Sequence, residues 1–215
     1  LNINVLVTAG PTFEAIDPIR FIGNRSSGKQ GIAIAKAFSE MGANVTLILG
    51  PSSQKIPEHV KVINIETAND MLDAVKKINN IDVAICAAAV SDWAIKNPSK
   101  NKIKKNNKNF PEINFSLNPD ILAYISNQKS NRPKLVIGFA AETNDLIKNA
   151  KDKLKSKKCD WIIANNVLDD SDIFGGENNT VTLITRDNIE PWDKCSKTDI
   201  AKKLSNKVIK EILGS

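Results

Sequence analysis

With 215 residues, the chain is long enough for one large α/β domain or two small ones, and its 41% hydrophobic and 25% charged residues are typical of a globular protein. The formal net charge of +6 favours anionic partners such as phosphorylated metabolites and nucleotides. A single tyrosine and no interleaving of aromatic with basic residues argue against a nucleic-acid-binding surface.

No targeting or membrane segment is recognisable in the sequence. No apolar run approaches the roughly 18 residues of a membrane-spanning helix, and the N-terminal residues lack the features of a signal peptide. Cys86, Cys159 and Cys195 show neither metal-site nor disulfide spacing. We therefore expect a cytoplasmic protein that binds no membrane and keeps its thiols reduced, with Cys86 as a small buried hydrophobic residue.

Short apolar runs alternate with amphipathic stretches along the chain. The runs are nearly continuous in hydrophobicity, which is typical of parallel strands covered on both faces. The expected strands are 3–10, 44–50, 60–65, 82–89, 134–141 and 160–165. The expected helices are 28–41, 68–79, 118–128, 144–158 and 198–213. The alternation predicts an α/β fold with a Rossmann-like, doubly wound, mainly parallel sheet flanked by helices, formed by residues 1–215 as a single domain.

Three local features add detail to this pattern. One helix is expected to begin at Asn118, with this residue as its cap and Pro119 in its first turn. Residues 94–116 are rich in Lys and Asn and are expected to form an excursion or lid. Residues 166–180 are rich in Gly, Asn and Asp, and are expected to form a loop before a further strand at 180–185.

The segment GNRSSGKQ, residues 23–30, is similar to a P-loop, but Gln30 stands where the Ser or Thr that binds magnesium is needed. Thirteen residues also separate Asn24 from the end of the first strand near Gly10, whereas in a P-loop protein the strand leads directly into the glycine turn. The dinucleotide pattern G-x-G-x-x-G is absent as well. Both standard nucleotide motifs therefore fail.

The same loop nevertheless has the residue types of an anion site. Ser26, Ser27 and Gly28 precede a helix whose first turn contains Lys29 and no acidic residue. Free backbone N–H groups, two hydroxyls and a lysine would favour an anion there. The alternative is that one serine only caps the helix and that Gly31 lets the helix pack closely on the sheet.

Taken together, the segments resemble those of a known family. In this order, the chain contains TAGPTFEAIDPIRFIGNRSSGKQG, AAAVSDW, KIKK, NPDIL, GFAAET, KKCDWIIANNV and FGGENNTVTLI. They closely resemble the phosphopantothenoylcysteine synthetase domain of bacterial coenzyme A biosynthesis, from residue 4 to the last helix. The combination of AGPT, RxxxNxSSGK and GFAAET is far more specific than any single glycine motif.

The resemblance implies a two-step ligation. The carboxylate of 4′-phosphopantothenate attacks the α-phosphorus of CTP to give an acyl-cytidylate and pyrophosphate, and the amine of cysteine then displaces CMP to form an amide. Mg²⁺ and cationic side chains would stabilise the charge at phosphorus. The resemblance also implies a homodimer, and a start at Leu1 is consistent with a flavin-dependent decarboxylase domain that precedes the ligase domain in the parent protein.

Individual roles also follow from the resemblance. Asn24 would hold and convert the acyl-cytidylate through its amide, and Arg20 would act in the second step. Lys153, with Lys157 near it, would neutralise triphosphate oxygens, although Lys151 and Lys155 are alternatives because the lysines are closely spaced. Without the resemblance, Arg20 would be interpreted as part of a surface ion pair and the lysines as a solvated helix face.

Further residues are expected around the nucleotide. The strand end 138–141 would let a pyrimidine approach the backbone, although its small residues also suit tight packing. The expected contacts are Gly10, Ser26, Ser27, Gly28, Lys29, Gly138, Phe139, Ala140, Ala141 and Phe174. Asp92, Lys104 and Lys105 are expected near the substrate phosphate or the metal without a firm role, and no metal ligand is identified.

Two other functions are considered. A nucleotide-dependent oxidoreductase would require a glycine fingerprint and a Tyr-x-x-x-Lys pair, but Tyr124, the only tyrosine, is followed by ISNQ. A non-catalytic nucleotide-binding module would require that Asn24 and Arg20 be dispensable, which the sequence leaves open.

Overall fold

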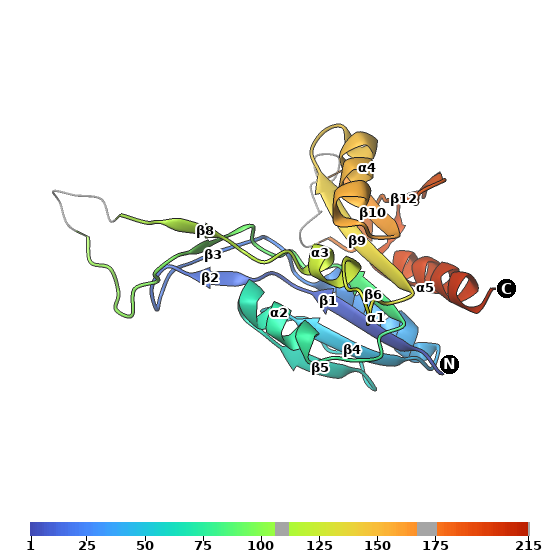
Figure 1. Cartoon of the computed structure of the whole chain (residues 1–215), viewed down its shortest axis with the longest axis horizontal. Coiled ribbons are helices and arrows are strands. Elements are labelled where there is room, and N and C mark those ends of the chain that lie inside the picture. The colour runs from blue at the N-terminus through green and yellow to red at the C-terminus, as the bar shows by residue number, and fades with distance from the viewer. Residues whose placement is uncertain (106–111, 167–175, 215) are drawn as a thin grey trace.

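The computed structural model describes residues 1–105, 112–166 and 176–214. Its centre is an eight-stranded sheet with the order β13-β12-β10-β9-β6-β1-β4-β5 (Figure 1). Neighbouring strands from β10 to β5 are parallel, whereas β12 and β13 extend the sheet as antiparallel strands. The strands are β1 (Asn4–Ala9), β4 (Asn44–Leu49), β5 (Lys61–Asn64), β6 (Val83–Cys86), β9 (Leu135–Glu142), β10 (Trp161–Asn166), β12 (Thr182–Ile184) and β13 (Ile189–Pro191).

The strand order confirms the predicted doubly wound sheet. The chain starts at β1 inside the sheet and adds β4 and then β5 on one side. It then returns past β1 and adds β6, β9 and β10 on the other side. The direction of winding therefore reverses between β1 and β6, and in such sheets ligands bind in the crevice at the carboxyl ends of these two strands.

Helices cover both faces of the sheet. On one face, α1 (Lys29–Glu40) and α5 (Lys197–Leu213) pack side by side over one hydrophobic core. The other face carries α2 (Ala68–Lys76), α3 (Ile121–Ser126) and α4 (Leu146–Lys157) over a second core. Every helix within the described residues is too short or too polar to span a bilayer.

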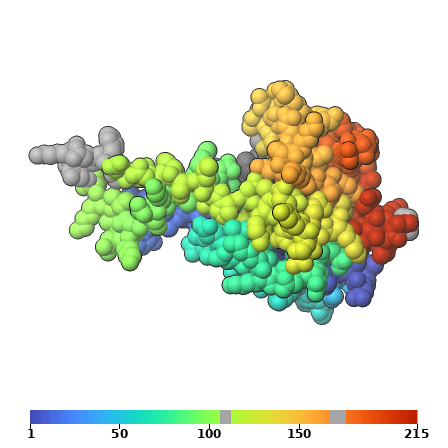
Figure 2. Space-filling model, in the orientation of Figure 1, coloured from blue at the N-terminus to red at the C-terminus, as the bar shows by residue number. Residues whose placement is uncertain are grey.

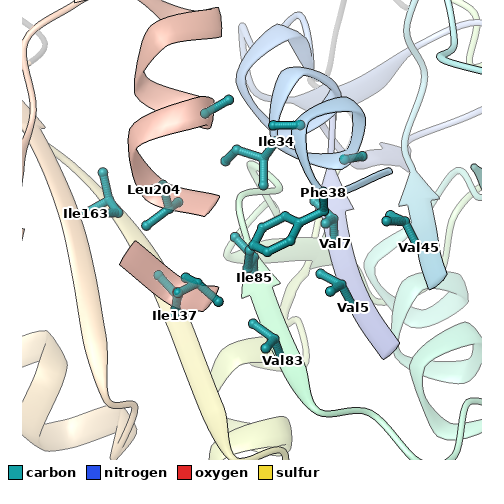
Figure 3. Close-up of a cluster of buried hydrophobic side chains, with 14 of the residues drawn as sticks. Val5, Val7, Ile34, Phe38, Val45, Val83, Ile85, Ile137, Ile163 and Leu204 are labelled. Atoms are coloured by element: carbon teal, nitrogen blue, oxygen red, sulfur yellow. The ribbon is translucent and has the colours of Figure 1, made fainter. Parts of the chain in front are cut away.

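The central strand β1 shows why a continuous apolar run is needed. Val5 and Val7 belong to the core under α1, where Phe38 is fully buried, and Leu6 between them belongs to the core on the opposite face (Figure 3). Successive side chains of a strand point to opposite faces, so both sets must be apolar when both faces are covered. Each such buried side chain contributes about 1.5–3 kcal/mol of transfer free energy.

A long projection extends from the domain on the side where β1 and β6 end (Figures 1 and 2). It contains two antiparallel hairpins, β2 (Phe13–Ala15) with β3 (Phe21–Gly23), and β7 (Trp93–Ile95) with β8 (Phe115–Leu117). We call residues 12–23, 93–105 and 112–117 the arm. The described residues of the expected excursion at 94–116 are therefore found in one half of the arm, whereas the β2–β3 hairpin was not expected from the sequence.

Other element boundaries differ from the sequence-based expectations. The expectation that Asn118 caps a helix is wrong, because Asp120 is the N-cap of α3 and accepts a hydrogen bond from Ala123 N at 2.8 Å. Asn118 instead donates to the carbonyl oxygens of Ser91 and Asp92, which joins the end of β8 to the loop after β6. The expected loop at 166–180 contains β11 (Asn178–Asn179), which pairs with β14 (Cys195–Ser196).

Candidate functional site

The segments AGPT and AAAVSD lie side by side where β1 and β6 end. Ala87 N donates to Thr8 O at 3.0 Å, Ala89 N donates to Gly10 O at 2.9 Å, and Thr12 N donates to Ala89 O at 3.3 Å. The parallel pairing of the two strands thus continues past their ends toward the arm. This places both motifs in the crevice where the sheet topology predicts a ligand.

The glycines of this region allow three chain segments to meet. Gly10 has φ +78°, and a Cβ on it would lie 3.0 Å from Gly50 O. Gly28 has φ +79°, and a Cβ on it would lie 3.3 Å from Gly10 Cα. The left-handed conformation favours glycine at both positions. The glycine loop is therefore seated directly on the end of β1.

Asn24 comes immediately after β3, at the base of the arm. Its Nδ2 donates to Ala89 O at 3.1 Å and to Val90 O at 3.3 Å. Within the described parts of the chain, no group donates to the Oδ1 of this exposed residue. The two carbonyls orient the amide, so its oxygen can accept a hydrogen bond from a ligand.

Arg20 is held at the other end of the same hairpin. Its guanidinium group donates to Asp17 and, at 2.9 Å, to the carbonyl oxygen of Ile103. The strand between Arg20 and Asn24 is extended, so the two residues lie about 13 Å apart along it. The structure therefore places these two expected catalytic residues in different parts of the arm.

The serines of the glycine loop bond to the loop's own backbone. Ser26 Oγ accepts from Gly28 N at 3.3 Å and Ser27 Oγ accepts from Lys29 N at 3.4 Å, while Gly28 is the N-cap of α1. Gln30 donates through Nε2 to the carbonyl oxygen at the start of α5. Gln30 thus joins two helices rather than facing the position of a P-loop magnesium ligand.

Lys29 is paired with Glu177, with Nζ 2.5 Å from Oε1. The pairing holds the pKa of the Glu177 carboxyl below its ordinary value. Nearby Lys197 is buried, and this burial, followed by the charge of Lys29, lowers the pKa of its ammonium group. The lysine at the start of α1 is therefore already partly neutralised by a residue near the start of α5.

The expected base-contacting residues differ in accessibility. Gly138 and Ala140 are buried, Phe139 is half-buried and Ala141 is exposed. A Cβ on Gly138 would lie 2.6 Å from Leu122 Cδ2, so this glycine allows α3 to pack on β9. Ala141 and the backbone beside it are the accessible part of this strand end.

Two lysines of α4 point inward, one to β9 and one to the N-terminus of α3. Lys153 Nζ donates to Phe139 O at 2.8 Å. Lys157 Nζ lies 2.6 Å from Asp120 Oδ2, at the N-terminus of α3. The alternatives Lys151 and Lys155 are exposed. The lysine pair favoured by the resemblance is thus the inward-facing pair of this helix.

Asp92, Lys104 and Lys105 are exposed, the first beside the crevice and the two lysines on the arm. Phe174 lies outside the described residues. Asp17 and Asp120 were not singled out from the sequence, although each holds an expected site residue. Asp17 precedes a proline and Asp120 follows Asn-Pro, so the sequence marks both as turn or cap residues. Nothing in that pattern indicates that Asp17 would hold Arg20 or that Asp120 would hold Lys157.

The whole chain is similar to proteins of coenzyme A biosynthesis. It is 41% identical over 211 residues to "Coenzyme A biosynthesis bifunctional protein CoaBC" of Haemophilus influenzae, covering 97% of this chain and 52% of that protein. It is 41% identical over 189 residues to the protein of the same name from Escherichia coli, covering 86% and 46%. The chain thus spans about half the length of these curated relatives.

A solved structure shows the same fold. The C-terminal domain of the coenzyme A biosynthesis bifunctional protein CoaBC superposes with a TM-score of 0.82 at 33% identity, covering 99% of this chain and 97% of that one. The family model described as "DNA/pantothenate metabolism flavoprotein C-terminal domain" matches residues 1–212. The chain therefore belongs to the DNA/pantothenate metabolism flavoprotein C-terminal domain family.

Proposed function

We propose that the chain is a phosphopantothenate–cysteine ligase. It activates 4′-phosphopantothenate with CTP as an acyl-cytidylate, releasing pyrophosphate, and then joins the acyl group to the amine of cysteine with release of CMP. The family and the names of its relatives support a place in coenzyme A biosynthesis. The observation that carries the proposal is Asn24, an amide oriented by two carbonyls at the reversal point of the sheet.

The chemistry requires an oriented amide more than a strong acid or base. Attack of a carboxylate on the α-phosphorus brings two anions together, and most of the catalytic effect comes from positioning and from neutralising their charge. The oxygen of Asn24 can accept a hydrogen bond from the substrate while Nδ2 stays on Ala89 and Val90. The reacting carboxylate and the phosphates carry no donor, so this hydrogen bond comes from an N–H or O–H group of the pantothenate moiety, and it orients the substrate beside the reacting carbonyl.

The lysines supply the positive charge. The ammonium group of Lys153 is held by Phe139 O, two residues before Ala141 on β9, and that of Lys157 by Asp120 at the N-terminus of α3. A nucleotide phosphate can take over the contact of Lys153, because a charged acceptor binds an ammonium group more strongly than a carbonyl does. Lys157 can bind a phosphate while it stays paired with the Asp120 carboxylate. The pyrimidine would then lie against the backbone around Ala141.

Magnesium fits this site as an ion carried by the nucleotide. In the residues that the structure describes, no cluster of three His, Cys, Asp or Glu side chains could hold a metal. Magnesium bound with phosphates usually needs only one or two protein carboxylates, and exposed Asp92 beside the crevice can provide one. When bound, the ion would neutralise charge at phosphorus.

The arm supports a homodimer. Its exposed large hydrophobic side chains include Phe115, at 58% exposed, and Leu117, at 83%. Clusters of this kind on a projecting element mark interaction surfaces in soluble proteins. A second copy that packs on the arm would cover these side chains. Within one chain the β2–β3 hairpin keeps Arg20 away from Asn24, but the Arg20 of the second copy could approach that Asn24.

The parent protein is proposed to be a cytoplasmic enzyme in which a flavin-dependent decarboxylase domain precedes this domain. The relatives are named bifunctional, and the chain matches about half of their length. The three cysteines form no disulfide in the described structure, which is consistent with a reducing compartment.

Incubation of the purified chain with CTP, Mg²⁺, 4′-phosphopantothenate and cysteine tests the proposal. Pyrophosphate release that depends on both CTP and phosphopantothenate is expected, and mass spectrometry should detect phosphopantothenoylcysteine. ATP in a parallel reaction identifies the nucleotide that is used. No pyrophosphate with any nucleotide would overturn the proposal, and nucleotide binding without turnover would favour a non-catalytic module.

A further inference from the structure

One carboxylate in the arm connects two segments that are distant in sequence. Asp17 Oδ1 accepts hydrogen bonds from Ile19 N and Arg20 N, both at 2.9 Å. Asp17 Oδ2 accepts from Ile103 N at 3.1 Å, from Arg20 Nε at 3.0 Å and from Arg20 Nη2 at 2.5 Å. The first oxygen thus closes the turn between β2 and β3, and the second holds a guanidinium group and a remote peptide.

The surroundings of Asp17 are those of a permanent anion. Its side chain is 0% exposed, whereas that of Arg20 is 49% exposed. The hydrogen bond from Arg20 is the largest of the contacts that keep the pKa of Asp17 well below its ordinary value of 3.8. The carboxylate is therefore covered and charged, while part of the arginine stays accessible to a ligand.

Both backbone polar groups of Ile103 are hydrogen-bonded to the β2–β3 turn. Its N–H donates to Asp17 and its carbonyl oxygen accepts from Arg20 Nη2 at 2.9 Å. Ser99 N also donates to Ile16 O at 3.0 Å, which anchors the same segment a second time. Ile103 is followed directly by Lys104 and Lys105, both exposed. The position of these lysines therefore depends on the carboxylate of Asp17.

We propose that Asp17 is a positioning residue for the ligase reaction: it orients the guanidinium group of Arg20 and holds the segment of Lys104 and Lys105 beside it, so that the arm presents one preformed cationic unit to an anionic substrate or intermediate. The inference depends on the proposed function. Cations that are already ordered stabilise a reacting anion without the loss of conformational entropy that ordering them on binding would cost.

The Asp17→Asn variant separates this role from closure of the turn. An asparagine can keep its side-chain oxygen on Ile19 N and Arg20 N, so the β2–β3 turn is retained. Its NH₂ group would then face the donors of Arg20 and of Ile103 N, and both contacts would be lost. Asp73→Asn is the matched control, because Asp73 is an exposed carboxylate paired only with Lys76 on α2.

The experiment measures both half-reactions in single-turnover mode, namely pyrophosphate release without cysteine and amide formation after cysteine is added. We expect Asp17→Asn to slow the same half-reaction as Arg20→Ala, roughly 10- to 100-fold, with a melting temperature near that of the parent. The rate loss of the double variant should be smaller than the product of the two single losses, because the carboxylate acts in part through the arginine.

Rate losses that multiply in the double variant, or equal slowing of both half-reactions by Asp17→Asn, would overturn the inference.

If Asp17→Asn does not fold, Arg20→Lys provides a second test. A lysine keeps the charge but loses the planar fork that Asp17 orients, so its rate should fall close to that of Arg20→Ala. A parent-like rate for Arg20→Lys would equally overturn it. Failure of the proposed function is distinct, because then the parent itself would release no pyrophosphate.

Discussion

The ammonium group of Lys153 lies 2.8 Å from the carbonyl oxygen of Phe139, so the middle of α4 is bonded to the accessible end of β9. Lys157, one helical turn further on, makes the equivalent contact to Asp120 on α3. Residues four apart share a helix face, so the spacing of these lysines places both on the inward-facing side of α4. The nucleotide phosphates are expected on this face.

Lys153→Met is expected to raise the KM for CTP about 10- to 100-fold, because a charge-assisted hydrogen bond to a phosphate contributes about 1.5–3 kcal/mol. Lys151→Met is the control, since Lys151 is exposed on the same helix. Steady-state kinetics and calorimetric CTP titration of both variants provide the measurement. Equal KM values for the two variants would remove Lys153 from the nucleotide site.

Asn24→Asp is expected to leave CTP binding within a few-fold of the parent but to slow turnover about 100-fold or more. The aspartate loses the two donors that bond to Ala89 O and Val90 O, and it places a negative charge beside an anionic intermediate. Rapid-quench assays would follow the acyl-cytidylate. Asn44→Asp, at the start of β4, is the control. Parent-like turnover of Asn24→Asp would show that the catalytic assignment is wrong.

The sheet could be predicted from the sequence because its strands are buried on both faces. Runs such as residues 82–89 and 134–141 have no polar face to solvate, and this continuity identifies parallel strands without further information. The alternation of strands with helices then predicts a doubly wound sheet, whereas the order of the strands comes from the structure. The family resemblance added the expected site residues. Periodicity alone would have assigned them to a solvated helix face of lysines and to glycines that allow tight packing.

An excursion at 94–116 was expected, but the hairpins of the arm could not be predicted, because their strands are only three residues long and have no periodicity to recognise. What holds them is long-range: Asp17 contacts Ile103, 86 residues away, and Asn118 contacts Ser91, 27 residues away. A long-range contact also explains why the predicted start of α3 at Asn118 was wrong. The Asn118 amide bonds across to another segment, and the next carboxylate, Asp120, takes the cap position instead.

Gly31→Ala is expected to destabilise the fold more than Gly138→Ala. The new methyl would lie 2.4 Å from Ala9 Cβ, which is part of the central strand and cannot rotate away. At Gly138 it would meet the ends of the Leu122 and Ile162 side chains at 2.6 and 2.8 Å, which can rearrange. Overpacking of this kind costs about 1–3 kcal/mol. Urea unfolding would rank the variants, and the opposite order would show that α1 can shift on the sheet.

Cys86 and Cys159 are expected to be almost inert to thiol reagents at pH 8. Burial raises the pKa of Cys86 to about 12 and that of Cys159 to about 11, so about 0.1% or less of either thiol is ionised. Cys86 is half-buried, as Cys195 is, and not fully buried as expected, but its strongly raised pKa should still let Cys195 react first. Labelling of native and urea-unfolded protein, with Cys195→Ser as control, checks this. Fast native labelling of Cys86 would contradict the raised pKa of its thiol.

The Phe115→Ser/Leu117→Ser double variant is expected to dissociate the proposed homodimer, because it removes two exposed apolar side chains from β8 of the arm. Light scattering should give the parent about twice the chain mass of 23.5 kDa and the variant a mass near 23.5 kDa. Ile189→Ser is the control, since Ile189 is an exposed hydrophobic residue on the edge strand β13, outside the arm. A monomeric parent, or a variant that remains dimeric, would show that these side chains do not mediate self-association.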